Sequence, residues 1–187
     1  MEFFFEKPRV MFLHVGGEGS VAALGGAVRR ALAVVADVRK AAPSPASAFG
    51  AATPSKSALD AAKLDAALGV RGTSKDGMYK AVFGRTVAAG CGCAVGAAMG
   101  VSTWAGFGGT DDDALVDGDF AVQEGELQPV LKSLRASGIS IVAIHHHMTG
   151  ETPRLLFLHY WGRGRAVALA QAVRRAVDLT AWDRGTK

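Results

Sequence analysis

The chain has 187 residues, 49% of them hydrophobic, and its 24 glycines indicate short packed elements joined by many turns. The formal net charge is only +4, and the 21 basic residues are spread along the chain, which argues against nucleic-acid binding. No apolar run approaches the roughly 20 residues of a membrane span, and the first residues lack the pattern of a secretory signal, so we expect a cytoplasmic protein with no membrane span.

An internal repeat organises the chain. Residues 8–32 align without a gap with residues 153–177, and 14 of the 25 positions are identical. Each segment is typical of a strand, a glycine-containing turn and a helix. Between the two copies lies a stretch rich in Pro, Ser and Ala, which is typical of a linker. The sequence therefore predicts four parts: the strand–helix tail of a first copy over 1–40, a linker over 41–56, a complete domain over 57–180 and a tail over 181–187.

Within the complete domain, the first elements in chain order are a short helix and three strands. The helix follows a capping-box spacing at Ser57 and Asp60 and ends before Gly69. Branched and aromatic residues, separated by glycine-rich turns, then predict strands over 78–83, 99–107 and 115–122.

A helix, a hairpin and a last helix complete the domain. Leu127, Val130 and Leu134 repeat at helical spacing, with Pro129 in the first turn. Buried strands over 139–144 and 154–161 flank a short turn and predict a hairpin, which is followed by a helix over 165–179. This order predicts an α+β fold in which one antiparallel sheet carries its helices on one face. Its β-α-β-β-α core is ferredoxin-like, and the N-terminal strand–helix unit is an addition to it.

The hairpin concentrates the histidines of the chain. All five lie in it or in its N-terminal counterpart. Since alternate residues of a strand share a face, His145 and His147 point to one face and His146 to the other. A turn over 149–153 pairs residues whose numbers add to 302 or 304, which places His159 on the face of His145, directly opposite or one step diagonal.

Three imidazoles on one face predict a metal site. His145, His147 and His159 could hold Zn²⁺, Cu²⁺ or Fe²⁺ with one coordination position left open for water or a ligand. Glu151 in the turn, like Asp117 and Asp119 on a neighbouring strand, is a candidate fourth ligand or general base. His146 is the second candidate catalytic residue.

Two other interpretations of the same histidines stay open. Without a metal, the histidines could shuttle protons or bind a small ligand, because the pKa of imidazole lies close to neutrality. In a purely structural interpretation, His159 is buried and hydrogen-bonded while His146 is exposed, and the hairpin has no catalytic or ligand-binding role.

Three segments of the chain are similar to the LppY/LpqO family of bacterial proteins: residues 98–107, the Gly-Asp-Phe run at 118–120, and residues 144–159. The resemblance covers the whole chain except the linker. It implies domains in tandem, which matches the repeat, and relatives that are often exported. The family's His-Asn-His stretch falls on 145–147, its Glu-x-Pro-Arg on 151–154, and its strand histidine on His159.

These observations predict a small bacterial domain that binds a transition metal or a small-molecule ligand at the histidine hairpin. Metal-assisted hydrolysis or a lyase-type proton transfer is the chemistry such a site would allow, and whether the protein is an enzyme stays open. The alternative is a non-catalytic interaction module, with a homodimer as one form, in which the histidines only support the hairpin.

Overall fold

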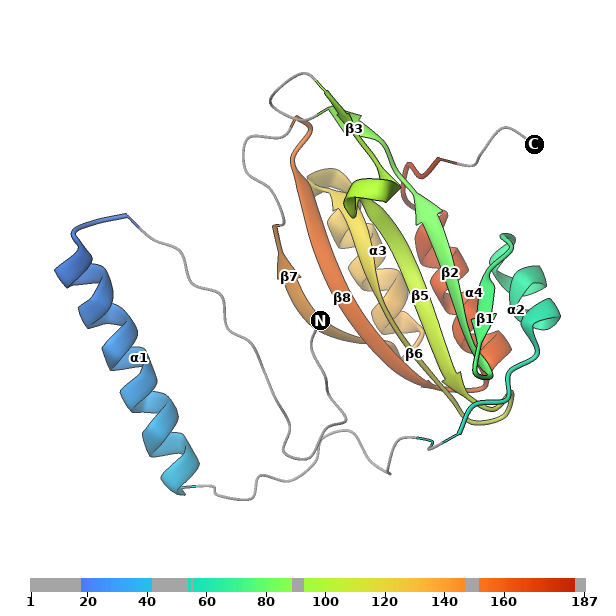
Figure 1. The fold of residues 1–187 in the computed structure, drawn as a ribbon, viewed down its shortest axis with the longest axis horizontal. Coiled ribbons are helices and arrows are strands. Elements are labelled where there is room, and N and C mark those ends of the chain that lie inside the picture. Colours follow the sequence, from blue (N-terminus) through green and yellow to red (C-terminus); the bar gives the residue numbers. More distant parts are fainter. Residues whose placement is uncertain (1–17, 42–53, 55, 89–92, 147–151, 184–187) are drawn as a thin grey trace. The chain divides into compact units, whose positions relative to one another are not determined.

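The structure is a computed structural model, and it describes residues 18–41, 54, 56–88, 93–146 and 152–183. The chain divides into two units, Met1–Thr53 and Pro54–Lys187. In the first unit the described element is helix α1 (Val21–Ala41), which contains the helix that the repeat predicts (Figure 1). The strand expected before it lies outside the described residues. No helix in the described ranges has both the length and the hydropathy to cross a membrane.

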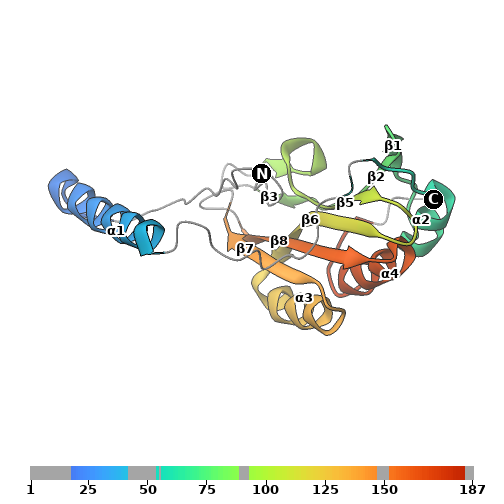
Figure 2. The ribbon, with the colours of Figure 1, turned by 90° about the horizontal axis from the view of Figure 1, so that it is seen from below.

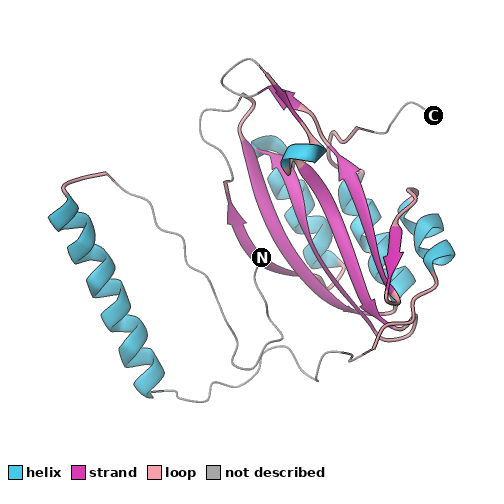
Figure 3. Cartoon of the chain, viewed as in Figure 1, coloured by secondary structure: helices cyan, strands magenta, loops and turns pink. Residues whose placement is uncertain are grey.

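Among its described residues, the second unit contains a six-stranded sheet, a two-stranded ribbon and three α-helices (Figure 3). The strands of the sheet are β1 (Thr73–Lys75), β2 (Met78–Gly84), β5 (Ser102–Gly109), β6 (Ala114–Gln123), β7 (Ser140–His145) and β8 (Leu155–Gly164). The ribbon pairs β3 (Val87–Ala88) with β4 (Ala94–Val95), and a 3₁₀ turn, η1 (Ala97–Met99), follows it. The helices are α2 (Ala61–Leu68), α3 (Glu124–Ala136) and α4 (Ala166–Val177).

The strand order confirms the α+β fold with a ferredoxin-like core. The sheet runs β1-β2-β5-β6-β8-β7, and all its neighbours are antiparallel. Strand β8 lies between β6 and β7, so β6 and β7 are parallel to each other and are joined through α3. This is the split β-α-β unit of the ferredoxin-like arrangement. Strand β5, which precedes the unit, lies beside β6 and pairs with β2 on its other side.

Two element boundaries differ from the sequence-based expectation for identifiable reasons. The strand expected from residue 99 begins at Ser102, because the 3₁₀ turn ends at Gly100 in the left-handed conformation (φ 83°). Helix α2 begins after Asp60, whose carboxylate accepts hydrogen bonds from the N–H groups of Ala62 and Lys63. Ser57 is not the cap, since its hydroxyl accepts a hydrogen bond from the N–H of Gly109.

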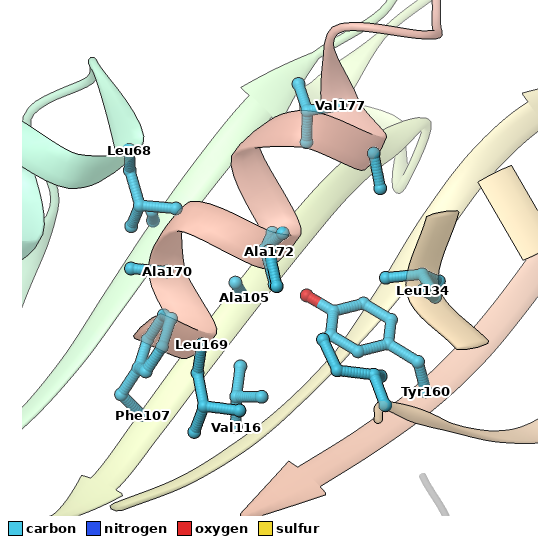
Figure 4. Close-up of a cluster of buried hydrophobic side chains, with 14 of the residues drawn as sticks. Leu68, Ala105, Phe107, Val116, Leu134, Tyr160, Leu169, Ala170, Ala172 and Val177 are labelled. Atoms are coloured by element: carbon cyan, nitrogen blue, oxygen red, sulfur yellow. The ribbon is translucent and has the colours of Figure 1, made fainter. Parts of the chain in front are cut away.

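The three helices of this unit pack on one face of the sheet, and the main hydrophobic core lies between them (Figure 2). Alternate residues of the strands enter this core, as Tyr79, Phe107, Phe120 and Tyr160 show. Figure 4 shows Leu68, Leu134 and Leu169, which come from three different helices and belong to this core. Each fully buried side chain of this size contributes about 1.5–3 kcal/mol.

The opposite face of the sheet carries a smaller cluster. Its members are Val87, Val95, Val101, Ala121, Leu155 and Phe157, so the β3–β4 ribbon covers one end of this face. Ala121 and Phe157 are cross-strand partners. Asp119 and His159 form the next pair along the same face. The small cluster therefore borders the histidines.

Candidate functional site

The pairing of β7 with β8 brings two of the predicted ligands together. His145 pairs with Phe157 and Ala143 with His159, so the two histidines are diagonal neighbours on one face, as the turn length predicts. Their Nε2 atoms lie 2.7 Å apart. The rings stack with 4.8 Å between centroids and 23° between planes. The hairpin thus holds two half-buried imidazoles in direct contact.

This contact restricts the protonation of the pair. At 2.7 Å one Nε2 carries the proton and the other accepts it, because two ring nitrogens can share only one hydrogen in such a bond. The acceptor nitrogen has a free lone pair only when the bond opens. The pair is therefore suited to passing a proton, or to exchanging its shared hydrogen for a metal ion.

The other predicted residues of the hairpin do not add to this pair in the described structure. His146 is exposed, and its Nδ1 lies 2.9 Å from the carbonyl oxygen of Leu155, across the hairpin. His147 and Glu151 lie outside the described residues. Within the part of the chain that the structure describes, no group of three His, Cys, Asp or Glu side chains is arranged to hold a metal ion.

A buried carboxyl, Asp119, lies in β6 directly across from His159. Only 5% of the residue is exposed, and its Oδ1 has no hydrogen-bond partner among the described residues. Burial raises the pKa of Asp119 to about 7, against the opposing effect of the Leu158 and Phe120 backbone amides. Asp119 is thus protonated at a pH at which an ordinary carboxyl is ionised.

A second carboxyl lies two residues along the same strand. Burial raises the pKa of Asp117, and the positive charge of Lys80 opposes this shift. The ammonium of Lys80 lies 4.5 Å from the centre of the Trp104 ring, a cation–π distance. Trp104 is in turn the cross-strand partner of Asp119. One row across the sheet therefore contains an indole, a buried carboxyl and an imidazole.

Gly118 and Tyr160 fix the strand that carries the two carboxyls. The Tyr160 hydroxyl donates a hydrogen bond to the carbonyl oxygen of Trp104, 3.0 Å away. A Cβ at residue 118 would overlap both groups of this hydrogen bond, so only glycine fits there. The Gly-Asp-Phe run thus combines a glycine needed for a close approach, a site carboxyl and the core residue Phe120.

The sequence named Asp119 only as one of several candidate carboxylates. The residue pattern Asp117-Gly-Asp119 in a strand with buried neighbours was the available indication, because alternation places both side chains on one face. What the pattern did not reveal is that this face is covered, and that Asp119 is therefore buried.

A separate cavity of about 500 Å³ lies away from the hairpin, between α2, the 111–113 turn and the start of α4. Its charged lining is paired: Lys63 contacts Asp111 at 2.8 Å, and Arg165 contacts Asp112 at 3.6 Å. The third aspartate of the turn, Asp113, accepts two hydrogen bonds from Arg163. These aspartates therefore fasten the turn to the two helices and to β8.

Residues 62–179, more than half of the chain, match the family model described as Domain of Unknown Function (DUF1259). No curated protein and no solved structure matches the sequence. The matched range includes Asp119, His145 and His159, so the residues that the fold brings together belong to the shared domain.

Proposed function

The chain belongs to the family of the Domain of Unknown Function (DUF1259), and we propose that its domain binds a transition-metal ion through His145 and His159. The observation that carries this proposal is the 2.7 Å approach of the two Nε2 atoms on one face of the sheet. Imidazole nitrogen is a common ligand of Zn²⁺, Cu²⁺ and Fe²⁺ in proteins.

The geometry of the pair is close to that of two ligands of one ion. Nitrogens that each lie about 2.1 Å from an ion at the tetrahedral angle are about 3.4 Å apart, so the two rings would separate by about 0.7 Å from their present 2.7 Å. His147, two residues after His145 in the sequence, is the proposed third ligand. Glu151 is proposed to assist as a base or further ligand.

A bound ion would polarise a carbonyl or activate water, which is the basis of the hydrolase or lyase chemistry proposed for the site. His146 is the other proposed catalytic residue. It directly follows β7 in the chain, with Nδ1 2.9 Å from the Leu155 carbonyl oxygen.

A second candidate function is metal-free acid–base binding of a small ligand. The observation that favours it is the same contact, because 2.7 Å is the length of a hydrogen bond between two imidazoles. Asp119, with its raised pKa, would then be a further proton-exchanging group in the same row. The two candidates differ in whether the pair holds an ion or a proton.

Calorimetric titration of the untagged protein with Zn²⁺ tests the first candidate. We expect about one ion per chain, and we expect His145→Gln and His159→Gln each to weaken binding by more than about tenfold, the loss that even supporting residues of metal sites cause. Gln128→Ala, an exposed change on α3, is the control and should bind as the wild type does. Absence of Zn²⁺ binding, or equal binding by all four proteins, would overturn the metal proposal.

Two finer assignments are also proposals. The motifs at 98–107, 118–120 and 144–159 support placing the chain with the LppY/LpqO-like proteins inside the wider family. The identity of 14 of 25 positions between residues 8–32 and 153–177 supports residues 1–40 as the tail of a first copy. A homodimer stays an alternative role, to be tested by the mass of the protein in solution.

A further inference from the structure

Asp119 is a buried residue of the site that the metal proposal does not use. Strand β6 alternates, with Phe120 and Val122 in the core beneath the helices and Ala121 in the small cluster on the opposite face. Asp119 therefore points to the opposite face, the face of His145 and His159. The residue is 95% buried there, since its exposed fraction is 5%.

The Oδ1 atom of Asp119 lacks a hydrogen-bond partner among the described residues. Folded proteins pair nearly all of their buried polar atoms, because an unpaired one has lost its hydration without compensation. An orphaned carboxyl oxygen therefore requires a reason. A structural reason is not apparent, because Leu or Val would fill the same space in a sheet without that cost.

The position of Asp119 in the sheet gives a functional reason for its unpaired oxygen. It is the cross-strand partner of His159, so the two side chains leave the sheet side by side, with Cβ atoms about 4.5–5.5 Å apart. A small molecule that contacts the His145–His159 pair would lie next to the Asp119 side chain. On the other side of Asp119 the row continues to Trp104, its cross-strand partner in β5.

We propose that Asp119 binds a hydrogen-bond donor, a hydroxyl or an ammonium group, of a small organic ligand that the His145–His159 pair also contacts. The inference rests on the proposed function, because the pair is the other half of the binding site. Above pH 7, where its carboxyl is ionised, Asp119 is only an acceptor, so an alcohol, a polyol or an amine fits Oδ1, whereas an ether or an ester carbonyl does not.

The first test is stability without any ligand. A carboxyl kept for binding destabilises the empty domain, so Asp119→Asn should have a higher urea midpoint than the wild type at pH 8 in the presence of a chelator. The matched control is Asp112→Asn, an exposed carboxylate whose only ion pair is 3.6 Å long among the described residues. It should leave the midpoint unchanged. A lower midpoint for Asp119→Asn would show a structural carboxyl and overturn the inference.

The second test uses glycerol, ethanolamine and 1,2-dimethoxyethane as probes, followed through the backbone amide resonances of Phe120, Leu158 and His159. We expect saturable shifts with a donor probe in the wild type, at least about tenfold weaker binding in Asp119→Asn, and no saturable shift with the diether. Saturation by glycerol alone would assign a hydroxyl, and by ethanolamine alone an ammonium. Equal binding in both proteins, or no saturation with either donor, would overturn the inference.

These tests are independent of the metal proposal, because both are made with a chelator present. Asp119 is not part of a metal-holding group in the described residues, so Asp119→Asn should bind Zn²⁺ within about twofold of the wild type. Donor-probe binding without Zn²⁺ binding would overturn the metal proposal and support the Asp119 site. Zn²⁺ binding without donor-probe binding would support the metal proposal and overturn the Asp119 site.

Discussion

Replacing Asp119 by Asn should change how the stability of the domain depends on pH. The carboxyl loses its proton near pH 3.8 in the unfolded chain and near pH 7 in the folded domain. Between these values the folded state holds a proton that the unfolded state has released, so stability is greatest below pH 3.8 and is lost as the pH rises to 7. The slope is about 1.4 kcal/mol per pH unit, which gives a total loss of about 4 kcal/mol.

Asparagine does not titrate in this pH range, so the free energy of unfolding of the variant should not fall in the way that the Asp119 carboxyl causes. Urea unfolding at intervals between pH 4 and pH 8, with a chelator present, measures the difference between the two proteins. We expect similar free energies of unfolding at pH 4 and a variant more stable by about 4 kcal/mol at pH 8. Parallel curves across this range would refute the argument, because they would mean that the Asp119 pKa is the same in both states.

Two further predictions concern the residues that support the site. Arg85 is 3% exposed, and its guanidinium donates two hydrogen bonds to the Glu126 carboxylate at 2.6 and 3.1 Å. Arg85→Met should therefore lower the free energy of unfolding, measured in urea, by about 3–5 kcal/mol. A loss below about 1 kcal/mol would contradict a buried ion pair. Gly118→Ala should cost about 1–3 kcal/mol or more, because its Cβ overlaps the Trp104 carbonyl and the Tyr160 hydroxyl. Gly125→Ala, with open space around its Cβ in α3, should instead stabilise by about 0.5–1 kcal/mol; equal effects of the two changes would contradict the steric argument.

The sequence could predict the hairpin closely because short-range rules determine it. The turn length sets the pairing sum, alternation sets the faces, and the structure pairs His145 with Phe157, which gives the predicted sum of 302. Helix α4 also agrees with its expected range, since its apolar residues recur at helical spacing and seven of them are buried. The α+β fold follows from the order of such elements.

Features that depend on the third dimension could not be predicted. The expected ferredoxin-like core implies that β8 lies between β6 and β7, but the sequence does not set the register of β6 on β8, which places Asp119 beside His159. The β3–β4 ribbon has only two residues in each strand, too few for a period to appear. The burial of Asp119 is likewise a property of the covered sheet face, so its raised pKa has no counterpart in the residue pattern.

The register of β7 shows the same limit on a smaller scale. The pairing shifts between Ile141 and Ala143, so Ser140 and Ile141 pair in a register that the turn does not set. The irregularity lies at the far end of the strand from His145. The predicted contact of the two histidines was therefore unaffected by it.

The metal content of the untagged protein tests the central claim most directly. The protein is incubated with Zn²⁺, freed of loosely bound ions by gel filtration and analysed by mass spectrometry of the metal, beside His159→Gln prepared in the same way. Because His159 supplies one of the two nitrogens that meet at 2.7 Å, we expect about one ion per wild-type chain and little metal in the variant. A metal-free wild type, or equal metal in both proteins, would contradict the claim.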